Sequence, residues 1–192
     1  MDDLDLLTAW RQGDRKAGDA LIRRHFDAVC RFFRTKLGDD IEDLIQRTFL
    51  DLLEASAPVD NLRATLFTIA RRRLIDHLRA RYQAGPVEGL TSISVADLGT
   101  SPSGVVARSE EERLLAEALR RISLDHQIAL ELAYWEDLSG PEIARVLGIS
   151  EHTVRSRLAR ARDALREAVA AVAGSPALGR STLDAFDARV AC

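Results

Sequence analysis

Apolar residues recur every three to four positions along most of the chain, which is the spacing of a buried stripe on an amphipathic helix. Residues 4–81 read as nearly continuous helix, with one break at Gly38 and another at Pro58. Three apolar stripes divide this stretch: Leu21, Ile22, Phe26, Val29, Cys30 and Phe33; Ile41, Leu44, Ile45, Thr48, Phe49, Leu52 and Leu53; Leu62, Leu66, Ile69, Ala70 and Leu74. Since no segment shows strand alternation and no repeat is found, the pattern predicts an all-α protein.

The pattern also divides the chain. Residues 1–81 form a first helical unit, and residues 82–107 are rich in Gly, Pro and Ser and contain no Lys or Arg, which is typical of a linker. Residues 108–173 are helical again. The remaining tail, 174–192, has Leu183, Phe186 and Val190 at helical spacing, and we expect disorder there rather than a short docked helix. The sequence therefore predicts two small helical domains joined by a flexible linker.

Composition excludes several classes of protein. The acidic N-terminus is unlike a signal or transit peptide, and no apolar run approaches the roughly 18 residues that a membrane-spanning helix needs. Cys30 and Cys192 are far apart, and neither has a partner at metal-ligand spacing, so we expect no metal site, disulfide framework or cofactor. Cys30 lies on an apolar stripe, as a core thiol does. These features favour a cytoplasmic protein without membrane insertion.

The net charge of −3 hides a strong segregation of charge along the chain. Residues 39–54 carry six acids and one base, whereas residues 63–81 carry six bases and one acid. Residues 150–166 carry five bases and two acids. Screening limits the reach of exposed charges to roughly 8–10 Å, so these local fields matter more than the sum. Two basic helices in separate units favour a shared polyanionic partner over two solvated helix faces.

Residues 139–165 have the pattern of a helix-turn-helix. Ser139 is a helix cap, Gly148 supplies the turn, and Ser150 caps the second helix. Ala144 and Val154 stand at the positions where a small residue and an aliphatic residue pack between the two helices. This motif places its second helix in the major groove of DNA.

A helical wheel separates the faces of this second helix. Val154, Leu158, Ala161, Leu165 and Val172 form its apolar stripe. The residues expected to reach base edges are His152, Thr153, Arg155 and Ser156. Those expected to bind phosphates are Arg157, Arg160 and Arg162.

Two further segments connect this motif to a family. Residues 40–50 (DIEDLIQRTFL) and 62–79 (LRATLFTIARRRLIDHLR) closely resemble region 2 of bacterial sigma factors, in the extracytoplasmic-function (ECF) group of the sigma-70 family. Residues 134–139 (YWEDLS) and 154–158 (VRSRL) resemble region 4 of the same group. The resemblance covers about residues 4–172 in the right order, with the linker between.

The resemblance implies a subunit that binds core RNA polymerase, directs it to promoters and melts the −10 region. Region 2 would bind the clamp helices of the largest subunit, and region 4 the flap of the second-largest subunit. The implied polymerase-binding residues are Asp40, Glu42, Asp43 and Gln46. The charge agrees, because a helix of net charge −5 suits a basic protein partner rather than DNA. An anti-sigma factor is a further possible partner of the family.

The basic helix over residues 63–81 would bind the −10 element. The resemblance implies that a flipped base would lie against the preceding loop, which contains Asp60 and Asn61. The helix residues implied in the −10 contact are Arg63, Thr65, Thr68, Arg71, Arg72 and Arg79. Three residues depart from the family pattern: Arg47 stands where an acid is common, Thr65 where Trp is frequent, and Arg72 where Asn is frequent.

Two other functions compete with this one. A helix-turn-helix regulator that acts without polymerase would bind duplex DNA alone, but it leaves the acidic helix without a role. A helical interaction module or an enzyme would need reactive groups in a recognisable arrangement. His25, His77 and His126 have no nucleophile and orienting carboxylate beside them in the sequence, so we expect no catalysis.

Overall fold

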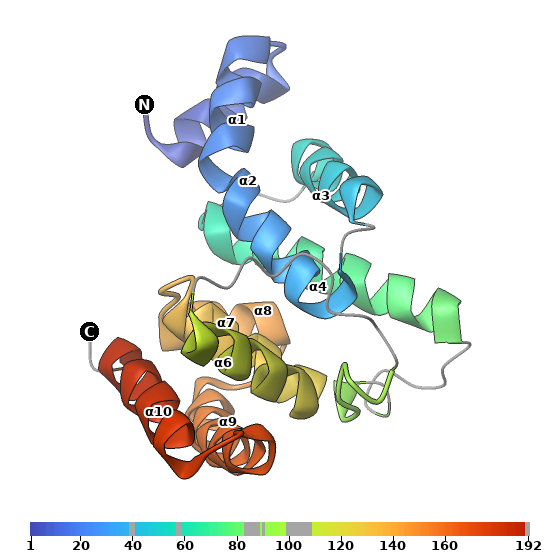
Figure 1. Ribbon diagram of the computed structural model, residues 1–192. Helices are drawn as coiled ribbons and strands as arrows, with labels where there is room; N and C mark the ends of the chain where they lie inside the picture. Colours follow the sequence, from blue (N-terminus) through green and yellow to red (C-terminus); the bar gives the residue numbers. More distant parts are fainter. Residues whose placement is uncertain (39–40, 57–58, 83–88, 90, 99–108, 191–192) are drawn as a thin grey trace.

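The computed structural model describes residues 1–38, 41–56, 59–82, 89, 91–98 and 109–190. Its N-terminal half, residues 1–82, contains α1 (Asp3–Arg11), α2 (Arg15–Leu37), α3 (Glu42–Glu54) and α4 (Leu62–Tyr82). Its C-terminal half, residues 109–190, contains α6 (Glu110–Arg121), α7 (Leu124–Tyr134), α8 (Gly140–Leu147), α9 (Glu151–Val172) and α10 (Pro176–Val190). Figure 1 shows the two halves one above the other. The all-α prediction is confirmed.

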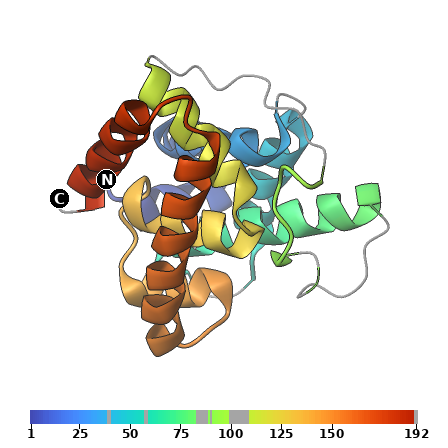
Figure 2. The ribbon, with the colours of Figure 1, turned by 60° about the horizontal axis from the view of Figure 1, so that its bottom comes forward.

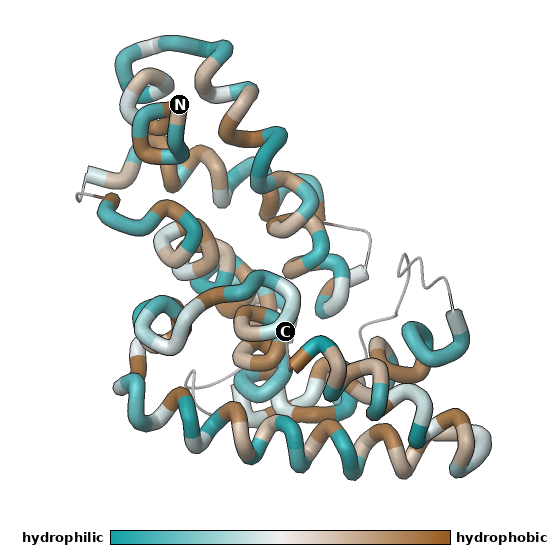
Figure 3. Tube along the Cα trace, turned by 90° about the vertical axis from the view of Figure 1, so that its left-hand side faces the viewer, coloured by the Kyte–Doolittle hydropathy of each residue, from teal (hydrophilic) through white to brown (hydrophobic). Residues whose placement is uncertain are grey.

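The predicted stripes form most of the core of the N-terminal half. Phe33 of α2, Leu52 of α3, and Leu66 and Leu74 of α4 have no measurable exposure to solvent. Hydrophobic residues recur between hydrophilic ones along the helices of both halves, as expected for amphipathic helices (Figure 3). One member of the predicted stripes is placed differently: Phe26 is 42% exposed, because the opposite face of α2 packs inward at that level.

Side-chain caps position α1 and α2 at the start of the chain. Asp2 and Asp5 form a reciprocal capping box at α1, and Asp14 accepts hydrogen bonds from two backbone amides at α2. Arg24 and His25 of α2 both contact the carboxylate of Asp3, at 2.5 Å and 2.8 Å. The first helix of the chain is therefore fastened to the second by both apolar and polar contacts.

The tail is helical over most of its length, so the expectation of disorder is wrong for residues 176–190. Ser175 caps α10, since its hydroxyl accepts a hydrogen bond from the amide of Leu178. Figure 2 shows α10 lying beside α6 and α9. The buried face of α10, with Thr182 and Phe186 each 1% exposed, explains the difference, because docking stabilises a helix that would be marginal alone.

Part of the segment predicted as a linker also packs on the C-terminal half. Ser94 pairs with Ser123 in an isolated bridge, and Val95 is 1% exposed. The amide of Leu124, at the start of α7, donates to the carbonyl of Ile93. Residues 83–88, 90 and 99–108 of the predicted linker lie outside the described residues.

The two halves share one apolar core. A continuous cluster of buried side chains joins Phe33, Phe67 and Leu74 of the N-terminal half to Ile128 and Ile143 of the C-terminal half. Helix α4 contacts α8, and helix α2 contacts α6 (Figure 1). The two predicted domains therefore pack against each other around this shared core. Among the described residues, no helix combines the length and the hydropathy that crossing a membrane requires.

Candidate nucleic-acid and polymerase interfaces

The helix-turn-helix has the local geometry that its sequence predicts. Ser139 and Glu142 form a capping box at the start of α8. Gly148 ends α8 at φ 68°, in the left-handed region where a residue with a Cβ is disfavoured. Ser150 caps α9 by accepting a hydrogen bond of 3.1 Å from the amide of Thr153. Val154 is 1% exposed, so the first turn of α9 packs inward on one side only.

The opposite side of this first turn faces solvent. His152, Arg155, Ser156 and Arg160 are exposed. Arg155 makes an ion pair of 3.7 Å with Glu151 on the same helix, and its side chain is 79% exposed. Arg160 donates to the carbonyl of Ser156, one turn earlier. These side chains form an accessible polar face at the N-terminus of α9, which is where a recognition helix meets base edges.

Other predicted residues of α9 are engaged within the protein. Arg157 lies 3.0 Å from Asp125 of α7, and its side chain is 19% exposed. Arg162 donates a hydrogen bond of 3.4 Å to the Tyr134 hydroxyl. The hydroxyl of Thr153 lies 2.7 Å from that of Ser150. To bind phosphates, as predicted, Arg157 would have to release Asp125, and Arg162 would have to release the Tyr134 hydroxyl.

The polar face of α4 is partly occupied by contacts within the N-terminal half. The hydroxyls of Thr65 and Thr68 donate to carbonyls one turn earlier in the chain, at 2.8 Å and 2.7 Å. Arg72 binds Asp51 of α3 at 2.8 Å, and Arg73 binds the same carboxylate. The hydrogen bond from Arg73 lowers the pKa of Asp51 from its ordinary value. Arg79 is half-buried near the end of α4.

The loop before α4 and the start of α4 contact α8. Asn61 caps α4 through its side-chain oxygen and donates to Glu142 at 2.6 Å through its side-chain nitrogen. Asp60 forms an ion pair with Arg145 of α8, and this hydrogen bond lowers the pKa of Asp60. Two residues implied in the −10 contact are therefore bound to the helix-turn-helix.

Glu136, between α7 and α8, joins two arginines of the other half. Its carboxylate lies 2.5 Å from Arg31 of α2 and 3.6 Å from Arg63 of α4. Arg63 also donates to the backbone carbonyl of Glu136. Burial raises the pKa of Glu136, and the hydrogen bond from Arg31 opposes that effect. Nothing in the motif indicated this role, because the arginines stand 105 and 73 residues away in the chain.

A buried ion pair lies beside this contact. Lys36 of α2 has no measurable exposure and binds the carboxylate of Glu131 of α7. The carbonyl of Phe32 accepts a second hydrogen bond from the same ammonium at 2.7 Å. Burial lowers the pKa of Lys36, although Glu131 acts in the opposite direction. Charged groups at this depth persist only when they are paired, so the pair depends on contact between the halves.

Asp125 links both candidate DNA-binding helices. Its carboxylate lies 3.4 Å from Arg71 of α4 and 3.0 Å from Arg157 of α9. The three side chains are 18–22% exposed. One acid thus neutralises an arginine predicted for the −10 element and an arginine predicted for the −35 element.

The acidic helix α3 presents the predicted polymerase-binding residues to solvent. Glu42, Asp43 and Gln46 are exposed, whereas Asp40 lies outside the described residues. Asp43 pairs with Arg47 at 2.8 Å, one turn later. Glu42 and Gln46 also line a groove of about 260 Å³.

This groove is apolar, and the sequence did not reveal it. Its other lining residues come from α1, α2 and α3: Trp10, Ile22, Phe26, Ile45, Phe49 and Leu50. Phe26 and Leu50 are 42% and 43% exposed. The helical spacing of Phe26 indicated an apolar stripe, but spacing alone does not say whether a stripe meets the core or a partner.

The histidines show no catalytic arrangement in the described part of the chain. His25 is buried against Asp3, and burial lowers its pKa although the aspartate opposes this. His126 follows the cap Ser123, and burial lowers its pKa also. Among the described residues, no three potential ligands are grouped as a metal site. Cys30 is buried as a free thiol in the apolar core, as predicted.

Comparison with known proteins relates both halves to one family. Residues 21–83 match the family model described as sigma-70 region 2, and residues 112–165 match sigma-70, region 4. The ECF RNA polymerase sigma factor SigL of Mycobacterium tuberculosis is 34% identical over 154 residues, covering 77% of this chain and 85% of the relative. The ECF sigma-E factor of Haemophilus influenzae is 26% identical, covering 87% and 95%.

Solved structures share the fold. CnrH, in complex with the cytosolic domain of CnrY, has a TM-score of 0.64 at 24% identity, covering 89% of this chain and 99% of that one. RpoE of Bartonella quintana, in complex with the anti-sigma factor NepR, has a TM-score of 0.62 at 24% identity, covering 81% and 97%.

Both family matches, in the predicted order, decide between the functions that the sequence left open. A regulator that acts without polymerase has no use for region 2, and the family is non-enzymatic. The chain belongs to the ECF group of the sigma-70 family and is an RNA polymerase sigma factor that directs the polymerase to promoters.

Proposed function

We propose a division of labour in which residues 1–81 bind core polymerase and the −10 element, and residues 108–173 bind the −35 element. Residues 82–107 join these units, and residues 174–192 lie outside both. The observation that carries the proposal is the exposed polar face on the first turn of α9, directly after the capped turn of a helix-turn-helix. A cytoplasmic location follows from this function.

The −35 contact is assigned to α9. His152, Arg155 and Ser156 are exposed on its first turn, so they can enter a major groove without rearrangement. A bidentate contact between arginine and guanine discriminates by about 1–3 kcal/mol, and Arg155 is the best-placed arginine for it. Arg160 is exposed one turn later and suits a phosphate contact.

The polymerase contact is assigned to α3 and the apolar groove beside it. Exposed acids at Glu42 and Asp43 suit a basic partner, and the half-exposed Phe26 and Leu50 supply the apolar centre that stable interfaces contain. By the family resemblance this partner is the clamp-helix segment of the largest subunit. The flap of the second-largest subunit is the partner proposed for the C-terminal half.

The −10 contact is assigned to the loop before α4 and to the polar face of α4. Asn61 and Arg63 stand at the start of this helix, and Thr68 and Arg72 are exposed further along it. Such a face suits the phosphates and bases of a melted strand, because single strands are bound by cationic grooves and by contacts to unstacked bases.

Promoter binding by both halves at once requires them to separate. Promoter elements at −10 and −35 are about 25 base pairs apart, which is roughly 85 Å of B-DNA. The closed arrangement instead brings Arg71 of α4 and Arg157 of α9 to the same carboxylate. We therefore propose that the contacts made by Asp125, Glu136 and Glu142 break when the chain binds polymerase and promoter.

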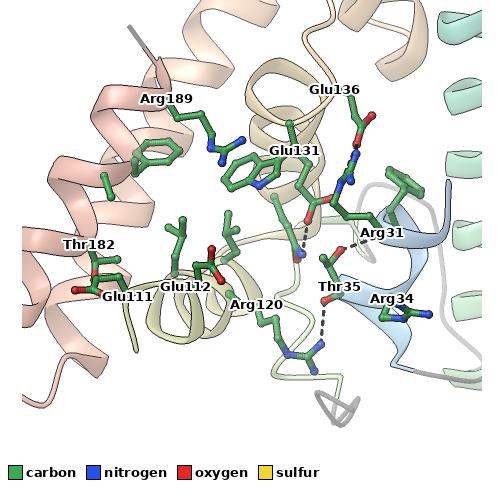
Figure 4. A pocket seen from close by; sticks show the side chains of 18 of the residues that line it. Arg31, Arg34, Thr35, Glu111, Glu112, Arg120, Glu131, Glu136, Thr182 and Arg189 are labelled. Atoms are coloured by element: carbon green, nitrogen blue, oxygen red, sulfur yellow. Dashed lines mark hydrogen bonds and ion pairs between the residues drawn. The ribbon is translucent and has the colours of Figure 1, made fainter. Parts of the chain in front are cut away.

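A cleft of about 820 Å³ between the halves is the proposed site for an anti-sigma factor. It is lined by α2, α6, α7 and α10 (Figure 4). The comparison with RpoE, which was solved with the anti-sigma factor NepR, supports this type of partner. A protein bound there would hold the closed arrangement, in which Arg71 and Arg157 are both paired with Asp125.

Transcription from genomic fragments with purified core polymerase tests the proposed function. Core polymerase with the chain should produce start sites that core alone does not produce. The same reactions with Arg155→Ala should lose these start sites, whereas a matched change three turns later in α9, Arg166→Ala, should retain them. New start sites that survive Arg155→Ala unchanged would contradict the assignment of α9.

A further inference from the structure

Two consecutive arginines of α4 converge on one carboxylate of α3. The Nη2 of Arg72 donates to Oδ2 of Asp51 at 2.8 Å, and the Nε of Arg73 donates to the same oxygen at 2.7 Å. A further hydrogen bond joins Arg73 to Oδ1, so Arg73 binds the carboxylate in a bidentate manner. Helices α3 and α4 pack against each other (Figure 1). Asp51 therefore connects the helix assigned to polymerase with the helix assigned to the −10 element.

The two arginines differ in their access to solvent. The side chain of Arg73 is 27% exposed and that of Asp51 is 16% exposed, whereas the side chain of Arg72 is 61% exposed. Arg72 uses a single N–H donor on Asp51, which leaves the other donors of its guanidinium available. The charge of Asp51 is already matched by the bidentate Arg73, so the three side chains together remain positive. The carboxylate thus orients Arg72 without neutralising it.

An oriented arginine is better prepared to bind an anion than an unrestrained one. The hydrogen bond from Arg73 lowers the pKa of Asp51, and the hydrogen bond from Arg72 acts in the same direction, although burial opposes both. The carboxylate is therefore ionised at neutral pH, and hydrogen bonds to it are charge-assisted. An arginine loses much of its rotamer freedom when it binds a phosphate. Because Asp51 already restricts Arg72, part of that loss occurs before DNA is bound.

The turn of α3 that carries Asp51 is held from α1. The Nη2 of Arg11 donates to the carbonyls of Leu52 and Ala55 at 3.0 Å and 2.7 Å, and its Nε donates to the carbonyl of Leu53 at 3.2 Å. The last turn of α3 contains no basic residue of its own, so Arg11 supplies the donors and the positive charge that a helix C-terminus favours. Helix α1 lies before the region 2 match. These contacts fix the backbone that positions Asp51.

Asp51 and Asp125 bind arginines of α4 in different ways. Asp125 belongs to the other half, and the two arginines that it binds are only 18% and 19% exposed, so it competes with DNA while the halves are in contact. Asp51 belongs to the same half as Arg72 and stays beside it when the halves separate. An acid placed in this way can hold a cation in position for a phosphate instead of covering it.

We propose that Asp51 is a positioning residue for the −10 contact, which holds Arg72 on the surface of α4 so that its remaining donors bind a phosphate of the melted strand. This inference rests on the proposed −10 role of Arg72 and names the residue through which that role depends on α3. Loss of Asp51 leaves the charge of Arg72 in place but removes its fixed direction.

A double-mutant cycle on open-complex formation tests the proposal. Core polymerase with the chain is mixed with a promoter that it transcribes, and permanganate reactivity follows the melting of bases. Asp51→Asn should slow melting about fivefold, and this slowing should disappear in the Arg72→Ala background, because residues that act through one another are not additive. Glu54→Gln removes an exposed acid from the same helix and is the matched control, with an unchanged rate of melting.

The salt dependence of binding separates positioning from a general charge effect. The probe is a promoter fragment with a single-stranded −10 segment, bound by core polymerase with the chain. Arg72→Ala should reduce the slope of log affinity against log salt by roughly 0.7, the value for one phosphate of a single strand. Asp51→Asn should reduce the slope by a similar amount. An unchanged or steeper slope for Asp51→Asn would show that Asp51 only repels DNA, and the proposal would then be wrong.

The cycle distinguishes failure of the inference from failure of the proposed function. If Arg72→Ala does not slow melting, Arg72 does not serve the −10 contact, and the inference is overturned with that assignment. If Arg72→Ala slows melting but Asp51→Asn does not, or if Asp51→Asn has the same effect in both backgrounds, the inference alone is overturned.

Arg73→Met separates positioning from the packing of α3 on α4. This change removes the bidentate partner of Asp51 but leaves Arg72 beside the carboxylate. Urea unfolding should show a loss of stability at least as large as that caused by Asp51→Asn, while the rate of melting is retained. Equal slowing of melting by Arg73→Met and Asp51→Asn would assign the effect of Asp51 to helix packing and contradict its positioning role.

Discussion

The carboxylate of Asp125 lies 3.0 Å from the guanidinium of Arg157, on the helix that we assign to the −35 element. It lies 3.4 Å from Arg71, on the helix that we assign to the −10 element. The carboxylate of Asp125 therefore competes with DNA phosphates for these two arginines while the halves remain in contact. Asp125, Glu136 and Glu142 are acidic groups of the C-terminal half, and each binds a residue predicted for the −10 contact: Arg71, Arg63 and Asn61, respectively.

Asp125→Asn should favour promoter binding. The change removes the charge shared by Arg71 and Arg157, and hydrogen bonds to charged groups typically contribute about 1.5–3 kcal/mol. We expect about a tenfold gain in the affinity of the chain, with core polymerase, for a promoter fragment, measured by anisotropy at fixed salt. Asp163→Asn removes an exposed acid from α9 and is the control. An equal gain from both variants would indicate a general charge effect and contradict the role of Asp125.

Arg155→Ala and Arg72→Ala should affect different steps. Arg155 is exposed on the first turn of α9, so its loss should weaken duplex −35 binding by about tenfold, within the range of about 1–3 kcal/mol for a base contact. Arg72 is exposed on α4, so its loss should slow formation of the open complex. Footprinting of the duplex complex and permanganate reactivity of melted bases separate the two steps. Equal effects of both variants on both steps would count against the division of labour.

The apolar groove beside α3 should be required for polymerase binding. Phe26→Ala with Gln46→Ala should weaken the affinity for core polymerase at least tenfold, because central apolar contacts dominate stable interfaces. The free energy of unfolding should fall only slightly, since Phe26 is half-exposed. Ile93→Ala, which removes a side chain of similar exposure from the segment between the two halves, is the control. Unchanged affinity of the double variant would place the polymerase contact elsewhere.

The helix-turn-helix and the tail show what local sequence can and cannot predict. Ser139, Gly148 and Ser150 act on backbone within four residues of themselves, so their types alone predicted the turn. Phe186 also stood at helical spacing, but the pocket that orders α10 is formed by Tyr134 and Trp135, some fifty residues earlier. Propensity therefore indicated a marginal helix, and a distant contact decided the outcome.

The contact between the halves was beyond sequence reasoning for the same reason. Glu136 stands within a segment that resembles region 4, and nothing near it in the chain indicates Arg31 or Arg63 as partners. The role of Phe26 was also ambiguous, because its apolar spacing fits a core stripe and a partner-facing stripe equally well.

The buried pair of Lys36 and Glu131 should show strong coupling. Glu131→Gln leaves an ammonium buried without its counter-ion, and we expect a loss of about 3–5 kcal/mol in the free energy of unfolding. Lys36→Met combined with Glu131→Leu removes both charges and should lose less than Glu131→Gln alone. Urea unfolding of the variants measures both effects. A double variant less stable than Glu131→Gln would contradict the account of the pair.

Acidification should destabilise the fold through His25. Burial lowers the pKa of this histidine below its ordinary value of 6.5, so just below pH 6.5 the unfolded chain binds more protons than the folded protein. The contribution of His25 to stability is therefore complete above pH 6.5 and decreases as the pH falls through that value. Urea unfolding at pH 7.5 and 5.5 should show a smaller difference for His25→Gln than for the unaltered chain. The exposed His152→Gln should leave the difference unchanged.

Separation of the two halves on the promoter is the central claim, and energy transfer between them tests it most directly. Dyes on Asp19→Cys of α2 and Glu167→Cys of α9, both exposed, would report the distance in a chain with Cys30→Ala and Cys192→Ser. We predict high transfer efficiency in the chain alone and a large decrease when core polymerase and promoter DNA are added together. Unchanged transfer efficiency in a complex that has melted the promoter would contradict the separation of the two halves.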